Sequence, residues 1–296
     1  MKGKFKKILF TVLTVGVVIV WGTTFASSKV LMDKGMDTID ILFVSFFIAY
    51  LSALTVSRKK LWSDNLKDEI IHCLCGLIGG AGYYLTQVEA LKYTLTTNVS
   101  IIVTAAPILT AILAYFIFKE KFSKQMLIGS VIALSGAVLV VFNGKFELDV
   151  DLTGNVLSIS AALSWAIYSI LLKILGQKYS TPFTIRKVFF YGLIGLLVYS
   201  VFHPLNIAID MLSDMTVIGN LIYLGLISSL VCYLIWGLAI KELDPTKTAN
   251  FMYLQPFATL LIGYFLLNEN ITAFSIVGLL LILGGVYLTE RISTNA

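Results

Sequence analysis

Ten long apolar stretches run along the chain, and each is about as long as a membrane-spanning helix needs to be. They cover residues 8–32, 38–56, 70–91, 94–118, 124–142, 152–173, 183–202, 217–240, 246–267 and 271–290. A helix crosses a hydrocarbon layer of about 30 Å with about 20 apolar residues, because each residue adds roughly 1.5 Å. Strands of a membrane barrel instead alternate over about ten residues. The continuous runs therefore predict an all-α polytopic membrane protein with ten transmembrane helices.

The composition agrees with a chain that lies in a lipid bilayer. Of 296 residues, 58% are hydrophobic and 13% are charged, whereas about a quarter of the residues in soluble domains are charged. This balance excludes a soluble enzyme, a disordered tail and a collagen-like rod. The first run follows a basic segment like that of a signal peptide, but it is longer than a usual signal core. Because its Trp21 and Lys29 recur later in the chain, we expect it to be retained.

The placement of lysine and arginine predicts how the chain crosses the membrane. Basic residues are enriched in cytoplasmic segments. With the N-terminus inside, 18 of the 22 basic residues fall in inside segments, and only Lys34, Lys92 and Lys145 fall outside. The remaining one, Lys29, lies within the first run. We therefore expect a multi-pass protein of the cell membrane with both termini in the cytoplasm.

The two halves of the chain are related by an internal repeat. Residues 76–141 align with 225–290 without a gap, and 17 of these 66 positions are identical. A shift of 144 positions pairs Trp21 with Trp165 and also pairs the two lysines eight residues further on. Five helices per half is an odd number, so the second half must enter the membrane from the opposite side. The sequence predicts two inverted five-helix repeats, 1–148 and 149–296, an architecture common among secondary transporters; a purely structural duplication stays open.

Three segments of this repeat resemble a known family. They are WGTTFASSK from Trp21, ALKYTLTTNVSIIVTAAPILTAILAYFIFKEKFSKQMLIGSVIALSGAVLVV from Ala90, and AIKELDPTKTANFMYLQPFATLLIGYFLLNENITAFSIVGLLLILGGVYL from Ala239. The chain is similar to the EamA-type transporters of the drug/metabolite transporter superfamily over nearly its whole length. The resemblance implies a ten-helix carrier that exports a small metabolite, such as an amino acid, from a bacterium. The family is broad in substrate, so the resemblance does not identify the cargo.

Polar and aromatic residues gather on single faces of several predicted helices. Trp21, Thr24 and Ser28 share one side of the first helix, because residues spaced by three and seven positions lie on the same side of a helix. Such groups face the protein interior, since hydrocarbon offers them no hydrogen-bond partner. We therefore predict a central cavity for an amphiphilic solute; for each aromatic residue alone, a packing or interfacial role is the alternative. The predicted cavity residues are Trp21, Thr24, Ser28, Tyr84, Gln87, Thr97, Thr104, Trp165, Tyr168, Ser229, Tyr233, Trp236, Asn250 and Tyr253.

Two charged residues within the predicted helices have two interpretations each. Charges in the bilayer cost about 2.5 to 3.5 kcal/mol on insertion scales. Lys29 could extend to the outer surface while Glu89 pairs with Lys92, in which case neither takes part in transport. Alternatively, Lys29 and Glu89 pair across two helices, and proton uptake by Glu89 drives the change of access.

Prolines and glycines mark other features of the predicted helices. Pro107 and Pro256 occupy repeat-related positions inside two runs, where proline is expected to kink a helix. These kinks are either hinges or fixed bends. Small residues let membrane helices approach closely, so Gly129 and Gly136 are expected at a helix contact.

Other functional classes lack the residues that they need. The two histidines form no HExxH motif, and the three cysteines show no zinc or disulfide spacing. No GxxxxGK[ST] loop, serine-nucleophile motif or paired intramembrane aspartates are present. We therefore expect no enzyme activity, cofactor or nucleic-acid partner, but a small-molecule substrate and the lipid bilayer, with a monomer as the simplest assembly. A passive channel and a non-transporting membrane sensor remain the alternatives to a carrier.

Overall fold

The chain folds into a helical assembly in a computed structural model. The structure describes residues 2–58, 60–94, 96–119, 124–142, 151–207, 211, 213–267 and 271–292, and all regular elements in these ranges are helices. The first half of the chain forms α1 (Lys2–Asp33), α2 (Thr38–Val56), α3 (Leu66–Leu74), η1 (Cys75–Gly82), α4 (Tyr83–Ala90), α5 (Thr96–Val103), α6 (Ala106–Phe118) and α7 (Lys124–Phe142). The second half forms α8 (Leu152–Gly176), α9 (Thr181–Ser200), α10 (Met215–Ile222), η3 (Tyr223–Val231), α11 (Cys232–Leu243), α12 (Pro245–Asn250), η4 (Phe251–Leu254), α13 (Gln255–Leu267) and α14 (Ala273–Ile292). The boundary expected between residues 148 and 149 lies outside the described residues.

Seven helices in the described ranges are long and apolar enough to cross a membrane. An eighth apolar helix, Ala273–Thr289, is shorter. Besides the run at 271–290, which matches this shorter helix, two of the ten predicted runs match none of these helices in the described residues. The run at 70–91 lies in a continuous helix that begins four residues earlier with polar and charged residues, and the run at 246–267 is divided into α12, η4 and α13.

Both halves contain a π-helical segment in the same relative place. The segment η1 joins α3 to α4, and η3 joins α10 to α11. A shift of 149 positions carries Cys75–Gly82 onto residues 224–231, which all lie within η3. The π-helix is rare and is often found at functional sites, so its occurrence at matching positions is a structural trace of the duplication.

The helix is also interrupted just before each of the two repeat-related prolines. Thr104 and Ala105 form a turn instead of a regular α-helix, and α6 then begins with Pro107 as its second residue. Pro256 is the second residue of α13 and follows the 3-10 segment η4. A proline in the first turn of a helix loses no intrahelical hydrogen bond, because the amide there has no acceptor. The structure therefore has a local change of helical hydrogen bonding just before each proline.

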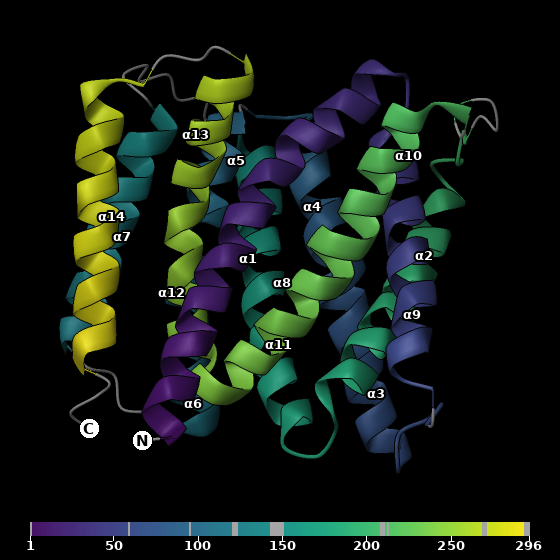
Figure 1. The fold of residues 1–296 in the computed structure, drawn as a ribbon, viewed down its shortest axis with the longest axis horizontal. Helices are drawn as coiled ribbons and strands as arrows, with labels where there is room; N and C mark the ends of the chain where they lie inside the picture. Colours follow the sequence, from purple (N-terminus) through teal and green to yellow (C-terminus); the bar gives the residue numbers. More distant parts are fainter. Residues whose placement is uncertain are drawn as a thin grey trace.

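The two halves of the chain interlock around the middle of the molecule (Figure 1). Helix α1 of the first half packs mainly against α11 and α13 of the second half, whereas α8 of the second half packs against α4, α5, α6 and η1 of the first. We call α1, α10–η3–α11 and α12–η4–α13 the first bundle, and α3–η1–α4, α5–α6 and α8 the second bundle. Helices α2 and α9 pack against each other along one side of these bundles, and α7 and α14 form a pair along another.

The contact between α7 and α14 depends on glycine. A Cβ atom on Gly136 would lie 2.4 Å from the carbonyl oxygen of Gly278, and one on Gly285 would lie 2.5 Å from that of Gly129. These crossed contacts show that the two helices run antiparallel with their backbones touching. The expected packing role of Gly129 and Gly136 is confirmed.

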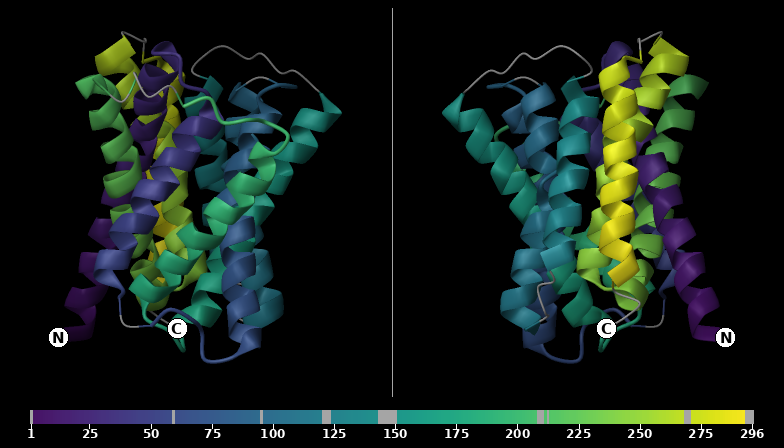
Figure 2. Two further views of the ribbon diagram at one scale, coloured as in Figure 1. Left: turned by 90° about the vertical axis from the view of Figure 1, so that its right-hand side faces the viewer. Right: turned by 90° about the vertical axis from the view of Figure 1, so that its left-hand side faces the viewer.

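The described ends of the chain lie at the same end of the molecule. Figures 1 and 2 place the start of α1 and the end of α14 together, and the loop between α2 and α3 lies at this end as well. We call this the terminal end and the opposite one the distal end.

Candidate functional site

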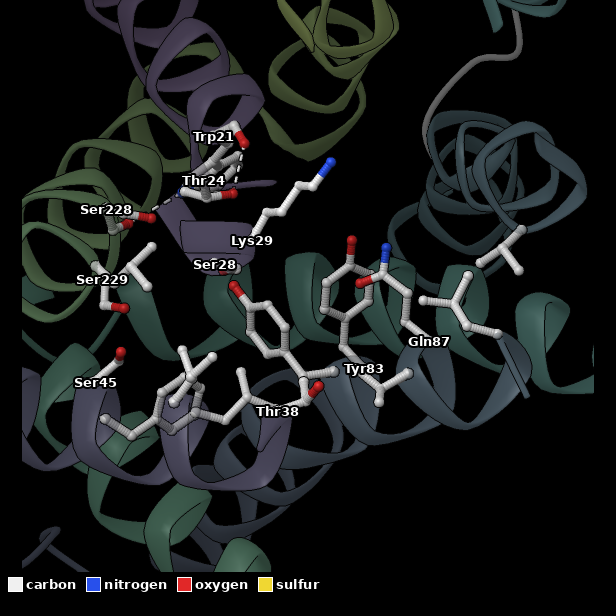
Figure 3. Close-up of a pocket in the computed structure, with 18 of the residues that line it drawn as sticks. Trp21, Thr24, Ser28, Lys29, Thr38, Ser45, Tyr83, Gln87, Ser228 and Ser229 are labelled. Atoms are coloured by element: carbon white, nitrogen blue, oxygen red, sulfur yellow. Dashed lines mark hydrogen bonds between the residues drawn. The ribbon is translucent and has the colours of Figure 1, made fainter. Parts of the chain in front are cut away.

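A cavity of about 270 Å³ lies between the two bundles (Figure 3). Trp21 and Trp165, which lie near the middle of α1 and α8, line its inner part. Met32, Thr38 and Leu91 also line it, and all three lie at or next to helix ends on the distal side. The cavity therefore extends from the middle of the molecule to the distal end.

Both bundles and α2 supply the walls of the cavity. The first bundle contributes residues from α1, η3, η4 and α13, and the second contributes residues from α4, α5 and α8. Most of the polar lining residues are neutral, and they come from six different helical segments. They are Thr24, Ser28, Thr38, Ser45, Gln87, Ser100, Ser228, Ser229 and Gln255. Lys29 is the only charged residue among the described residues that line the cavity.

Aromatic rings close the cavity on its inner side. The ring of Trp21 lies 5.3 Å from that of Trp165 and 4.9 Å from that of Trp236, measured between centroids. The indole nitrogen of Trp21 donates a hydrogen bond of 3.1 Å to the carbonyl oxygen of Ser228. The hydroxyl of Tyr233 donates to that of Tyr84 over 3.2 Å. The Trp21–Trp165 and Tyr233–Tyr84 contacts join the first bundle to the second, so the bundles touch here, whereas the cavity separates them towards the distal end.

Seven of the predicted cavity residues line this cavity: Trp21, Thr24, Ser28, Tyr84, Gln87, Trp165 and Ser229. Six others are buried and do not line it: Thr104, Tyr168, Tyr233, Trp236, Asn250 and Tyr253. Thr97 lies in α5, and its side chain is outside the described residues. Residues at equivalent positions of the two halves therefore usually differ in environment: one lines the cavity and the other lies in the packed core.

Several buried polar atoms have no hydrogen-bond partner within the described structure. They include the indole nitrogens of Trp165 and Trp236, the hydroxyls of Tyr168 and Thr246, and both side-chain polar atoms of Asn250. A buried polar group without a partner costs about 1 to 3 kcal/mol. Trp165 and Trp236 belong to the aromatic layer that closes the cavity. Their unpartnered N–H groups therefore destabilise the closed arrangement of this layer.

Glu89 and Lys29 do not pair with each other. Glu89 bonds to Lys92, with 2.6 Å between the nitrogen and the carboxylate oxygen, and also accepts a hydrogen bond from Tyr199. Neither Glu89 nor its two partners line the cavity, whereas Lys29 does. Glu89 therefore pairs with Lys92, which is the first of its two interpretations, and Lys29 lies at the cavity.

Some lining residues were missed by the sequence analysis, among them Tyr83, Ser45, Ser100, Ser228 and Gln255. Ser228 lies in a π-helical segment, where i→i+5 hydrogen bonds widen the turn and bring an extra residue to one face. Ser45 and Gln255 are polar residues within apolar runs, and this signal alone could have identified them. Tyr83 and Ser100 have no repeat-related polar partner, so the comparison of the two halves did not select them.

Ion pairs tie the helices together at the terminal end. Lys173 of α8 and Asp244, which precedes α12, form a 2.9 Å ion pair that joins the two bundles. Lys6 and Glu242 form a pair of 2.5 Å within the first bundle, between α1 and α11. Asp244 has a φ of 76°, a conformation that is strained for an L-residue other than glycine.

A further network at this end centres on Glu69 in the first turn of α3. Glu69 accepts hydrogen bonds from Lys187 and Tyr191 of α9, and from the backbone amide of Ser63 over 2.8 Å. Burial alone would raise the pKa of this carboxyl, but these hydrogen bonds outweigh burial and lower its pKa to about 2. The carboxylate thus links α3 to α9 in its ionised form.

Comparisons with known proteins agree with this architecture. The sequence profile of the EamA-like transporter family matches residues 8–142 and again 152–291. An uncharacterized transporter of Archaeoglobus fulgidus is 27% identical and covers 92% of this chain and 93% of its own length. A probable amino-acid metabolite efflux pump of Salmonella typhimurium is 26% identical, with 92% and 91% covered. A solved crystal structure with a TM-score of 0.80 and 14% identity shares the fold over 97% of this chain and 98% of the other.

Proposed function

Because this chain belongs to the EamA-like transporter family, we propose that it exports a small amphiphilic metabolite, such as an amino acid, by alternating access. Membership confirms the resemblance seen in the sequence and identifies a multi-pass membrane transporter rather than an enzyme. The relatives from Salmonella typhimurium and Escherichia coli named as probable amino-acid metabolite efflux pumps are 26% and 25% identical. They support an amino acid or a related metabolite as the first class of solute to test.

The cavity between the bundles is the observation that carries the proposal. It is continuous with the distal end and closed towards the terminal end by the aromatic layer. A carrier exposes its binding site to one side at a time, whereas a channel needs a path open to both sides during conduction. A cavity with one closed side therefore favours the carrier over the channel.

We further infer that the chain consists of two inverted five-helix repeats, 1–148 and 149–296, with both termini in the cytoplasm. The two family matches, the antiparallel pairing of α7 with α14 and the matching π-helical segments support this arrangement. Tags on the two ends test it in intact cells. Both tags are expected to be inaccessible to an impermeant probe until the membrane is permeabilised. Labelling of either tag in intact cells would exclude the orientation.

The proposed binding residues form two groups that become accessible in turn. Solute entering from the distal end would contact the lining residues, among them Trp21, Thr24 and Gln87. Trp236, in the aromatic layer, and buried residues outside the cavity such as Asn250 would contact solute when the terminal end opens. Their unpartnered polar atoms support this assignment, because a solute or water would then supply the missing hydrogen bonds.

Counterflow in reconstituted vesicles tests the proposed function. Vesicles preloaded with an unlabelled amino acid are expected to take up the same labelled amino acid faster than empty vesicles do. Gln87→Ala is expected to slow this exchange, and Glu89→Gln, outside the cavity, serves as the matched control. Solute flux without acceleration by preloading would indicate a channel, and no flux for any of the 20 amino acids tried would remove amino acids as the proposed cargo.

A further inference from the structure

The cavity contains one positive charge and no negative charge among its described lining residues. Lys29 lies on the distal part of α1, and no aspartate or glutamate lines the same cavity. Figure 3 shows its side chain extended from α1, while the polar ends of Tyr83 and Gln87 point towards the same open space. The ammonium group of Lys29 is therefore the one formal charge among the described lining residues.

Lys29 has no hydrogen-bond or ion-pair partner among the described residues, unlike the other described lysines at the distal end. Neighbouring lysines at the distal end are paired: Lys34 with Asp214 over 2.7 Å, and Lys92 with Glu89 over 2.6 Å. The lysine at the repeat-related position, Lys173, has a 2.9 Å ion pair with Asp244. No hydrogen bond or ion pair joins Lys29 to any residue that the structure describes.

Lys29 is exposed at the opening of the cavity, beside its apolar walls. Charges in a cleft with walls of low dielectric constant attract ions of opposite sign more strongly than charges on an open surface. Trp21, Tyr83, Tyr84 and Trp165 provide an apolar wall in the same cavity. A solute that matches both features has an apolar or aromatic body and one anionic group.

We propose that Lys29 binds the carboxylate of the transported solute, so that the cavity selects amphiphilic carboxylates over amines of the same shape. This inference rests on the proposed transport function and specifies the chemistry of its site. Ser28 and Thr24, which precede Lys29 on α1, offer hydroxyl groups to the carboxylate, while the aromatic wall packs against the body.

Direct binding to the purified full-length protein in detergent tests this proposal. The probes are 3-phenylpropionate, 3-phenylpropanamide and phenethylamine, which share a body and differ in charge, and binding is followed by the shift in melting temperature and by calorimetry. The wild-type protein is expected to bind the carboxylate most tightly. Lys29→Gln is expected to weaken carboxylate binding by about tenfold or more, because a hydrogen bond to a charged group is lost, and to leave amide binding within about twofold.

Two further variants control for folding and for general charge. Lys29→Arg keeps the positive charge and is expected to retain most of the carboxylate binding. Lys34→Gln removes a lysine at the same end that does not line the cavity, and it is expected to bind like the wild type. Equal binding of the carboxylate by Lys29→Gln and wild type, tighter binding of phenethylamine by the wild type, or no carboxylate binding at millimolar concentration would each overturn the proposal.

Counterflow on the same proteins separates this inference from the proposed function. Carboxylate binding that depends on Lys29 in a protein without counterflow supports the site and contradicts the transport function. Counterflow of amino acids that is equal in wild type and Lys29→Gln supports the transport function and contradicts the role of Lys29.

Discussion

Individual indole groups near the cavity differ in whether their polar atom has a partner. The indole nitrogen of Trp21 donates to the carbonyl of Ser228, whereas that of Trp236 has no partner among the described residues. Both side chains are buried and lie in the same aromatic layer. The two residues therefore offer a matched comparison of a satisfied and an unsatisfied polar group.

Replacing each tryptophan with phenylalanine is expected to have different effects. Trp21→Phe removes a hydrogen bond and leaves the Ser228 carbonyl without its donor, so it should lower the free energy of unfolding by about 1 kcal/mol more than Trp236→Phe. Thermal unfolding in detergent measures the difference. An equal loss of stability in the two variants would show that the hydrogen bond of Trp21 contributes nothing, and Trp236→Phe is expected to impair transport despite its stability.

Glu69 gives the protein a pH dependence of known sign. Its pKa in the folded state is about 2, below the usual 4.5, so folding is favoured by its ionised form. This stabilisation is complete above pH 4.5 and is lost as the pH falls towards 2, with an upper limit of about 3 kcal/mol.

Glu69→Gln is expected to remove this contribution. The variant should be less stable than the wild type at neutral pH, and the difference should shrink between pH 4.5 and pH 2, when stability is measured by denaturant unfolding in micelles. Glu242→Gln, which removes the ion pair with Lys6, is the control and should show a smaller difference. A constant gap between Glu69→Gln and wild type across this range would contradict the assigned pKa.

At the scale of helices, α7 and α14 touch through glycines that admit no side chain. A Cβ atom on Gly278 would lie 2.6 Å from the carbonyl oxygen of Gly136, whereas one on Gly284, in the same helix, would meet nothing within 4 Å. Gly278→Ala is expected to destabilise the protein by about 1 to 3 kcal/mol, because the two backbones must move apart. Gly284→Ala should be neutral or slightly stabilising, and equal effects in thermal unfolding would contradict this contact.

The helices themselves were largely predictable because membrane spans have a strong local signal. The runs at 38–56 and 124–142 coincide with α2 and α7, since apolar length alone determines them. The π-helical segments and the turn before Pro107 were harder to predict from the sequence, because they depend on packing against other helices. Trp236 was placed at the cavity from its ideal helical face, yet the structure buries it beside Trp21, because a single sequence does not reveal which side of a carrier is closed.

At the scale of the whole molecule, the ion pair between Lys173 and Asp244 joins the two bundles at the terminal end. Asp244→Asn keeps the shape of the side chain and removes its charge. A partly exposed ion pair contributes up to about 1 kcal/mol, which corresponds to about a fivefold change in a two-state equilibrium. The variant is therefore expected to populate the state with an open terminal end up to about fivefold more than the wild type.

Alkylation of a buried position measures this shift. Thr246→Cys, at a site with 4% exposure, is expected to react with a permeant maleimide faster when combined with Asp244→Asn, in a background without the native cysteines. Reversing both charges, Lys173→Asp with Asp244→Lys, should restore the slow rate. Lys6→Gln breaks an ion pair within one bundle and should leave the rate unchanged, and acceleration by this control would contradict a specific role for the inter-bundle pair.

The exchange of α1 and α8 between the halves also has a consequence for biogenesis. Helix α1 is synthesised long before its main packing partners, α11 and α13. During synthesis the polar face of α1 therefore stays incompletely covered until α11 and α13 have been inserted. Neither half can complete its tertiary structure alone. Assembly is thus completed only after translation of the second half, and two separately expressed halves would have to meet in the membrane to restore the native protein.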